Sequence, residues 1–185
     1  RSQQFSTGLE FKKDILILGA GGFLRHGMDL IDWTRPSSND IWQATNLGKV
    51  DFRGLDFSLK ISPSRDQAVL GIKQFAFSYN YISAKKKASG FLSKYALDIL
   101  KHRYILSIHQ NIFGLSLSWD MSYNERYYGE KYFLGNLYVG KKITGKGFTA
   151  EPFISIDNLA NTKYSEVGGV LQPRRWMRGG IKCSW

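Results

Sequence analysis

The stretch Leu115-Ser116-Leu117-Ser118-Trp119-Asp120-Met121-Ser122-Tyr123-Asn124 decides the fold, because every second residue in it is apolar. A β-strand places alternate side chains on opposite faces, whereas a helix would scatter this pattern around its axis. The same alternation recurs in residues 55–62, 74–81 and 177–185, and only residues 91–101 have a spacing that suits a helix. The sequence therefore predicts an all-β chain.

We expect about nine antiparallel strands, joined by connections that alternate in length. Short turns on one rim, long loops on the other and abundant aromatic residues are typical of a transmembrane β-barrel of the outer membrane. The chain has 12 Phe, 10 Tyr and 5 Trp among 185 residues, which fits this architecture. The expected strands are 3–12, 14–33, 42–61, 70–83, 94–110, 114–126, 131–142, 148–157 and 172–185.

The strand directions predict that the chain is one part of a larger barrel. With the short turns on the periplasmic side, the last strand ends there and Arg1 lies at the extracellular rim. Bacterial single-chain barrels have even strand numbers, and hydrocarbon does not tolerate unpaired strand edges. We therefore expect residues 1–185 to be the C-terminal part of a β-barrel domain whose first strands precede Arg1.

One motif favours a different class of protein. The apolar run 15–18, which follows Asp14, opens into Gly19–Gly22, which is similar to the phosphate-binding turn of a nucleotide-binding enzyme. Leu24 or Arg25 stands where the third glycine of that motif is needed, and no amphipathic helix follows. In a barrel, glycines at this point would mark a strand bend or a close approach of another segment.

The charge and the histidines indicate no further function. The net charge of +11 could suggest nucleic acid as a partner, but the basic residues are dispersed among expected turns and loops. His26, His102 and His109 have no metal-ligand spacing, so no metal site is expected.

The end of the chain resembles a known family. Residues 154–164 and 172–180 are similar to the C-terminal end of TonB-dependent outer-membrane receptors. There an alternating strand precedes Asn-Leu, Asn/Asp-x-x-Tyr, a loop, Gln-Pro-Gly-Arg, an aromatic residue and Gly. Arg174 stands where the family usually has Gly. The matching residues, with the terminal aromatic that is similar to an outer-membrane assembly signal, are Asn158, Leu159, Asn161, Tyr164, Gln172, Pro173 and Trp185.

The resemblance implies roughly the last nine of about 22 barrel strands, with the plug domain and the TonB box absent from this chain. Residues 29–33, 41–46, Gly54 and 93–98 resemble Bacteroidetes-type receptors, including those for cobalamin. Such receptors take up scarce, bulky nutrients, and their barrels do no covalent chemistry and need no cofactor. Cobalamin, siderophore and glycan substrates all stay open. The alternative is a passive porin or a structural barrel without a plug.

The resemblance also implies partners and a binding surface. The expected partners are the N-terminal remainder of the receptor, TonB through the plug, outer-membrane lipid and lipopolysaccharide, and a surface lipoprotein, with no nucleic acid. Substrate contacts are expected among outer-loop side chains that can stack or donate hydrogen bonds. These are Trp33, Arg35, Trp42, Lys94, Tyr95, Arg126, Tyr127, Tyr128 and Arg174.

Overall fold

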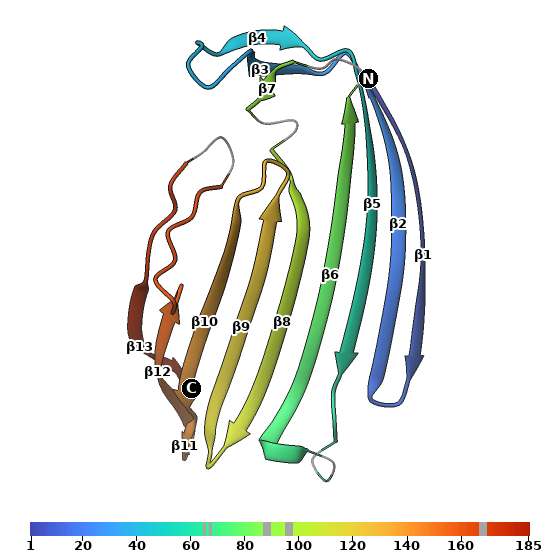
Figure 1. Ribbon diagram of the computed structural model, residues 1–185. Coiled ribbons are helices and arrows are strands. Elements are labelled where there is room, and N and C mark those ends of the chain that lie inside the picture. Colours follow the sequence, from blue (N-terminus) through green and yellow to red (C-terminus); the bar gives the residue numbers. More distant parts are fainter. Residues whose placement is uncertain (65, 67, 87–89, 95–97, 167–169) are drawn as a thin grey trace.

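The computed structural model describes residues 1–185 except 65, 67, 87–89, 95–97 and 167–169. The described residues form a large antiparallel sheet of nine long strands and the short β11 (Ile143–Gly145), and a small sheet of three strands (Figure 1). The long strands are β1 (Ser2–Lys13), β2 (Leu16–Met28), β5 (Lys49–Ile61), β6 (Ile72–Lys86), β8 (Leu100–Ile112), β9 (Leu115–Arg126), β10 (Lys131–Lys141), β12 (Phe148–Asp157) and β13 (Trp176–Ser184). The small sheet contains β3 (Ile31–Arg35), β4 (Gln43–Asn46) and β7 (Leu92–Ser93).

This architecture confirms the expectation of an all-β chain with about nine strands. No α-helix occurs in the described part of the chain, where η2 (Val69–Gly71) is a short 3-10 turn. Within these residues, no helix is long and apolar enough to cross a membrane.

The register gives the large sheet one apolar and one polar face. Leu59, Phe77 and Leu106 lie opposite one another on the neighbouring strands β5, β6 and β8. Asp56 and Asn80, an odd number of positions away on β5 and β6, pair on the other face. Because successive side chains of a strand alternate between faces, the sequence period decides which face each residue joins.

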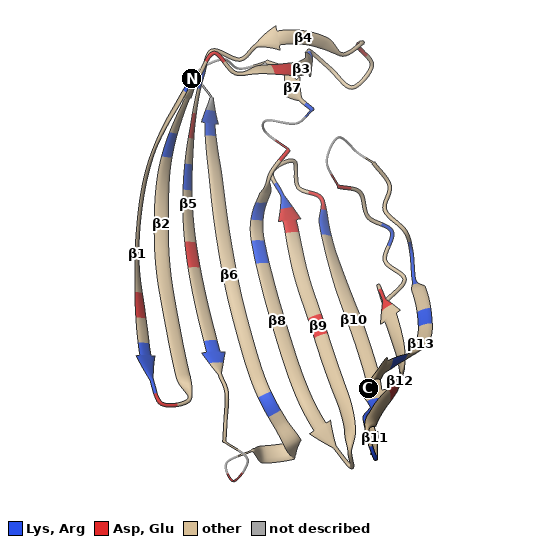
Figure 2. Cartoon of the chain, turned by 180° about the vertical axis from the view of Figure 1, so that it is seen from behind, with Lys and Arg blue, Asp and Glu red and all other residues tan. Residues whose placement is uncertain are grey.

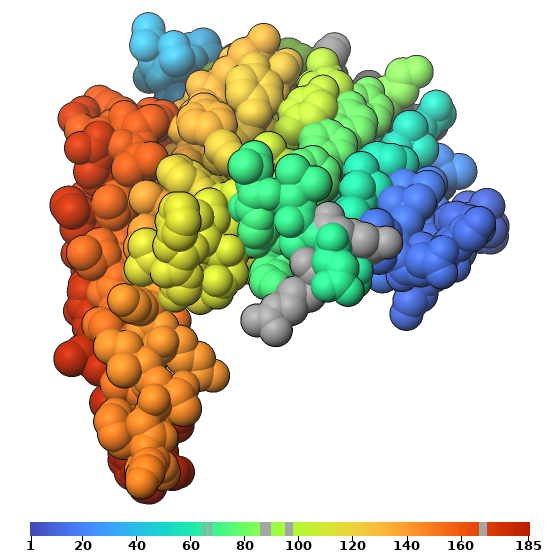
Figure 3. Space-filling view, turned by 90° about the horizontal axis from the view of Figure 1, so that it is seen from below, coloured from blue at the N-terminus to red at the C-terminus, as the bar shows by residue number. Residues whose placement is uncertain are grey.

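The described residues form no second layer over the apolar face. Leu9, Leu55 and Ile154 are 84%, 62% and 55% exposed. Among the described residues, the buried apolar side chains are Leu47, Val50, Ala84 and Tyr132. A β-sandwich would bury its apolar face against a second sheet, so this face requires an apolar environment from outside the chain. Seen from below, the sheet is strongly curved (Figure 3).

Aromatic side chains form a continuous row on the apolar face. Each ring lies directly opposite the next across a strand pair, and the Tyr79 and Tyr104 rings stack with centroids 4.7 Å apart. Such cross-strand aromatic pairs stabilise a sheet by up to about 1 kcal/mol each. The row consists of Phe57, Tyr79, Tyr104, Tyr123 and Phe133.

The two rims of the sheet differ as the connection lengths predict. Arg1 and the small sheet lie at one rim, and the turns before β2 and β9 lie at the other, near the C-terminus (Figure 1). Most Lys and Arg residues of the long strands lie toward the strand ends (Figure 2). Val50 and Ala84, on the polar face of β5 and β6, form a buried cluster with Leu47 beside the small sheet. The long connections therefore fold over the polar face.

Several strand boundaries predicted near this rim are wrong. Residues 14–33 do not form one strand, because β2 ends at Met28 and β3 belongs to the small sheet. The backbone turns at Asp29, which has a φ of 56° and whose N–H donates to Gly48 O at 2.8 Å. Residues 42–61 are divided in the same way into β4 and β5.

Three other strands begin later in the chain than predicted. β6 begins at Ile72 because η2 precedes it, β8 begins at Leu100 rather than at residue 94, and β13 begins at Trp176 rather than at residue 172. In each case the connection before the strand is longer than the one predicted from the alternation of apolar and polar residues.

The glycines that resembled a nucleotide-binding turn lie in the middle of β2. Gly21 pairs with Gly8 on one side and with Asp56 on the other. A Cβ atom at Gly21 would lie 2.8 Å from an Asp56 carboxylate oxygen, so glycine admits a close approach of that side chain. No helix follows, and the structure therefore does not support the nucleotide-binding alternative.

Candidate functional site

A pocket of about 470 Å³ lies between the small sheet and the adjacent ends of β8, β9 and β10. Its size falls within the range of small-molecule sites, about 300–1,000 Å³. Four separate connections contribute, since the pocket contains residues that follow β2, β6, β9 and β12 in the chain. The lining residues are Arg35, Trp42, Leu92, Ser93, Lys94, Asp98, Arg126, Tyr128, Glu130, Ser165 and Glu166.

On one side of the pocket, two cationic side chains lie close to the indole ring of a tryptophan. The Arg35 Cζ atom lies 4.4 Å from the centroid of the Trp42 ring, and the Lys94 Nζ atom lies 5.8 Å from it. Arg35 Nη1 donates a hydrogen bond to Ser38 O at 2.7 Å. Arg35 Nε is buried and has no hydrogen-bond acceptor among the described residues. This side of the pocket is therefore both aromatic and positively charged.

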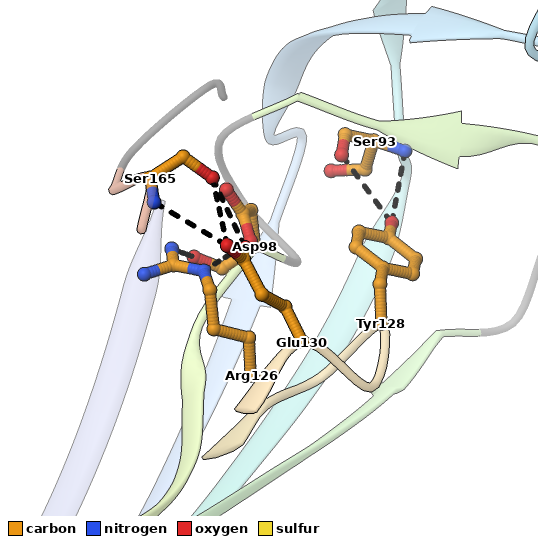
Figure 4. Close-up of polar contacts among 6 residues, drawn as sticks. All are labelled: Ser93, Asp98, Arg126, Tyr128, Glu130 and Ser165. Atoms are coloured by element: carbon orange, nitrogen blue, oxygen red, sulfur yellow. Dashed lines mark hydrogen bonds and ion pairs between the residues drawn. The ribbon is translucent and has the colours of Figure 1, made fainter. Parts of the chain in front are cut away.

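Tyr128 ties the small sheet to the turn between β9 and β10 (Figure 4). Its hydroxyl accepts a hydrogen bond from Ser93 N at 3.0 Å and donates to Ser93 O at 3.3 Å. The Ser93 hydroxyl donates in turn to the buried carboxylate of Asp32. Burial raises the pKa of Tyr128, and the bonds with Ser93 counter only part of that effect. Tyr128 is therefore a neutral hydroxyl at physiological pH.

Two further contacts connect residues that line the pocket (Figure 4). Arg126 Nε pairs with Asp98 Oδ1 at 2.8 Å, and their side chains are only 6% and 14% exposed. Ser165 Oγ donates to the Glu130 carboxylate at 3.0 and 3.1 Å, which joins the connection after β12 to the start of β10. These contacts fix the positions of charged groups that would otherwise move with their loops.

Comparisons with known proteins identify the family of the sheet. The family described as TonB dependent receptor-like, beta-barrel matches residues 1–159. The chain belongs to this family. No curated protein sequence matches it significantly. The family describes a receptor barrel rather than an enzyme, which fits the expectation that the chain does no covalent chemistry.

Two solved receptors share the fold of this TonB-dependent receptor barrel. The ferric preacinetobactin receptor BauA of Acinetobacter baumannii is 14% identical with a TM-score of 0.72, and the match covers 97% of this chain and 29% of the receptor. The FrpB iron transporter of Neisseria meningitidis (F3-3 variant) is 11% identical with a TM-score of 0.67, covering 97% of this chain and 30% of that protein. The chain thus spans less than a third of either relative.

The structure brings five of the nine predicted contact residues together in the pocket: Arg35, Trp42, Lys94, Arg126 and Tyr128. Trp33 and Tyr127 do not line it. Trp33 is 48% exposed, and Tyr127 packs edge-on against Tyr128. Arg174 is exposed on the connection before β13, and Tyr95 lies outside the described residues.

The acidic residues and the serines of the pocket were not predicted. Ser93 and Asp98 lie inside the segment 93–98 that resembles Bacteroidetes-type receptors, so that segment contained a signal for them. Glu130 and Ser165 gave no such signal. A carboxylate such as Glu130 is omitted when residues are selected for stacking and hydrogen-bond donation, and the contact of Ser165 with Glu130 joins distant parts of the chain.

Residues of the C-terminal motif hold the connection between β12 and β13. Asn158 is 5% exposed, has a φ of 51° and bonds to Thr162 in both directions, at 2.8 and 2.9 Å. The Tyr164 ring stacks on Tyr132 of β10 with centroids 4.9 Å apart. Arg175, rather than Arg174, donates two hydrogen bonds to Leu159 O.

The remaining motif residues have smaller roles in this connection. Asn161 Oδ1 accepts a bond from Arg175 N at 3.1 Å, and Gln172 N donates to Tyr164 O at 3.1 Å. Pro173 O lies 3.5 Å from Asn158 Nδ2. Trp185 follows the end of β13 and is 97% exposed.

Replacing Tyr128 with phenylalanine should loosen β7 without unfolding the large sheet. The change removes the acceptor of the Ser93 N–H, a loss of about 1 kcal/mol. Hydrogen exchange at the Ser93 amide should therefore be about five times faster, while exchange within β9 stays unchanged. Tyr127→Phe is the matched control, because the Tyr127 hydroxyl makes no hydrogen bond within the described part of the chain. Equal effects of both changes would refute a specific role for Tyr128.

Proposed function

We propose that this chain forms part of the wall and the extracellular rim of a TonB-dependent receptor that takes up a bulky, scarce nutrient across the bacterial outer membrane. The observation that carries the proposal is the family match over residues 1–159 of a sheet whose apolar face is left exposed by the part of the chain that the structure describes. The pocket at the rim of the long connections supplies part of the outer binding surface.

The complete receptor requires segments beyond this chain. The remaining strands would pair with the free edges of β1 and β13, since an unpaired edge is unfavourable in lipid. A plug domain inside the barrel would contact TonB, outer-membrane lipid and lipopolysaccharide would surround the apolar face, and a surface lipoprotein is a further proposed partner. In this arrangement the proton gradient, transmitted by TonB, drives uptake.

An iron chelate is the substrate class to test first. The two solved receptors with the same fold are named as a ferric preacinetobactin receptor and an iron transporter, although at 14% and 11% identity they support the fold alone. The resemblance of residues 29–33, 41–46, Gly54 and 93–98 to Bacteroidetes-type receptors, which include those for cobalamin, makes cobalamin the second candidate. A glycan is the third.

Transport can be tested in cells that produce the complete receptor. Uptake of radiolabelled iron from ferric siderophores, and of labelled cyanocobalamin, should depend on the receptor and should fall to background when TonB is deleted or the proton gradient is collapsed. Uptake that persists without TonB would indicate a passive porin instead. Production of the receptor with Arg126→Gln and with the exposed Lys146→Gln, at the opposite rim, would separate an effect of the pocket from a general loss of transport.

A further inference from the structure

We propose that Arg35, Trp42 and Lys94 form a subsite for an oxyanion, a carboxylate or phosphate group, of the transported nutrient. This inference rests on the proposed function and goes beyond it, because it selects among substrate classes. An iron chelate with carboxylates or a compound with a phosphate would satisfy the subsite, whereas a neutral glycan would not.

The first support for the proposal is the unsatisfied guanidinium. Arg35 Nη1 has Ser38 O as a partner, but Nε has no acceptor, and no carboxylate in the described part of the chain forms an ion pair with Arg35. A buried donor without a partner costs about 1–3 kcal/mol. A planar guanidinium matches the two oxygens of a carboxylate or phosphate, so a small rotation of the side chain toward the pocket would pair both of its edges.

The second support is the arrangement of like charges. Arg35 ends β3 and Lys94 follows β7, and both cations lie near the ring of Trp42, at 4.4 and 5.8 Å. The backbone fixes this proximity, because Thr34 and Arg35 pair with Ser93 and Leu92. Two cations held beside one ring repel each other, and an anion between them would remove that repulsion.

The acidic groups of the pocket do not cancel this local charge. The lining contains Asp98, Glu130 and Glu166 beside its three basic residues. Asp98 is bonded to Arg126, and Glu130 is bonded to Ser165 from the connection after β12. Asp98 and Glu130 are therefore held by contacts with β9 and with that connection, while Arg35 and Lys94 lie against the Trp42 ring.

Small anions of both kinds test the subsite directly. Citrate and pyrophosphate should change the tryptophan fluorescence of the complete purified receptor, and the change should be absent from Trp42→Phe and should weaken with added NaCl. Arg35→Gln and Lys94→Gln should each reduce the affinity at least about tenfold, which corresponds to about 1.4 kcal/mol. Lys146→Gln, an exposed lysine at the opposite rim, is the matched control and should bind like the unaltered receptor.

The outcomes separate this inference from the proposed function. Stronger binding of citrate than of pyrophosphate assigns the subsite to a carboxylate, and the reverse assigns it to a phosphate. If neither anion gives a signal that depends on Trp42 and Arg35, the subsite is refuted. A signal from neutral maltoheptaose that persists in Arg35→Gln also refutes it. Uptake that depends on TonB would survive either refutation, and Arg35→Lys, which keeps the charge but loses the planar fork, should give an intermediate affinity.

Discussion

Gly71→Ala is expected to lower the free energy of unfolding of the complete receptor by at least about 3 kcal/mol. Gly71 has a φ of 66°, and a Cβ atom there would lie 2.1 Å from the backbone oxygen of Asn111 in β8. A backbone atom cannot rotate away as a side chain can, so the turn before β6 would have to separate from β8. Urea unfolding in detergent micelles, followed by heat-dependent mobility on a gel, measures the loss.

Gly114→Ala is the matched control for this change. Gly114 has a similar φ of 77° and also lies in a turn at the same rim, but nothing lies within 4 Å of the added Cβ. It should cost only the left-handed backbone penalty of about 1–2 kcal/mol. Equal unfolding midpoints for the two variants would show that the contact with Asn111 has no energetic weight.

Asn158→Ala is expected to cost about 3 kcal/mol. The change removes both side-chain bonds to Thr162, at 2.8 and 2.9 Å, and places alanine at a φ of 51°. Because Asn158 N also donates to Asn136 Oδ1 at 2.9 Å, strain at this residue reaches β10. The same unfolding measurement applies, and hydrogen exchange across the connection from β12 to β13 should increase with it.

Asn161→Ala separates the buried amide from the backbone effect. Asn161 has a φ of 56° but is exposed, and its side chain accepts a single bond, from Arg175 N. Both variants carry the same left-handed penalty, so their difference compares the two bonds of buried Asn158 with the single bond of exposed Asn161. Equal losses in the two variants would contradict the structural role assigned to Asn158, because its buried amide loses one more hydrogen bond than Asn161 does.

The large sheet could be predicted from the sequence because its cause is local. Alternation assigns each side chain to a face, as in residues 115–124, which form most of β9 with the expected faces. The small sheet could not be predicted in this way. Apolar residues continue through Leu30 and Ile31, so nothing in the period reveals that the backbone turns at Asp29. The small sheet also depends on a distant contact, because the Ser93 hydroxyl bonds to Asp32, which lies 61 residues away in the sequence.

The pocket was predicted in part, for a related reason. Trp42, Arg35 and Lys94 could be selected because cationic and aromatic side chains in an outer loop suit ligand binding. Arg174 is exposed and stays a predicted contact, whereas the neighbouring Arg175 makes the bonds that hold the last connection. That outcome depends on the path of the loop, which composition does not determine.

The pairing of β3 with β7 couples the conformations of two connections, the one after β2 and the one after β6. Thr34 and Arg35 pair with Ser93 and Leu92, so residues 29–48 are built around a strand that lies in another loop. In a chimaera that receives only residues 29–48 from a receptor with a different substrate, β7 would lie beside a strand whose sequence did not evolve to pair with it. A transfer of substrate specificity should therefore exchange both connections, the one that contains β3 and the one that contains β7. The two should also have diverged together in evolution, because a substitution in one favours a compensating substitution in the other.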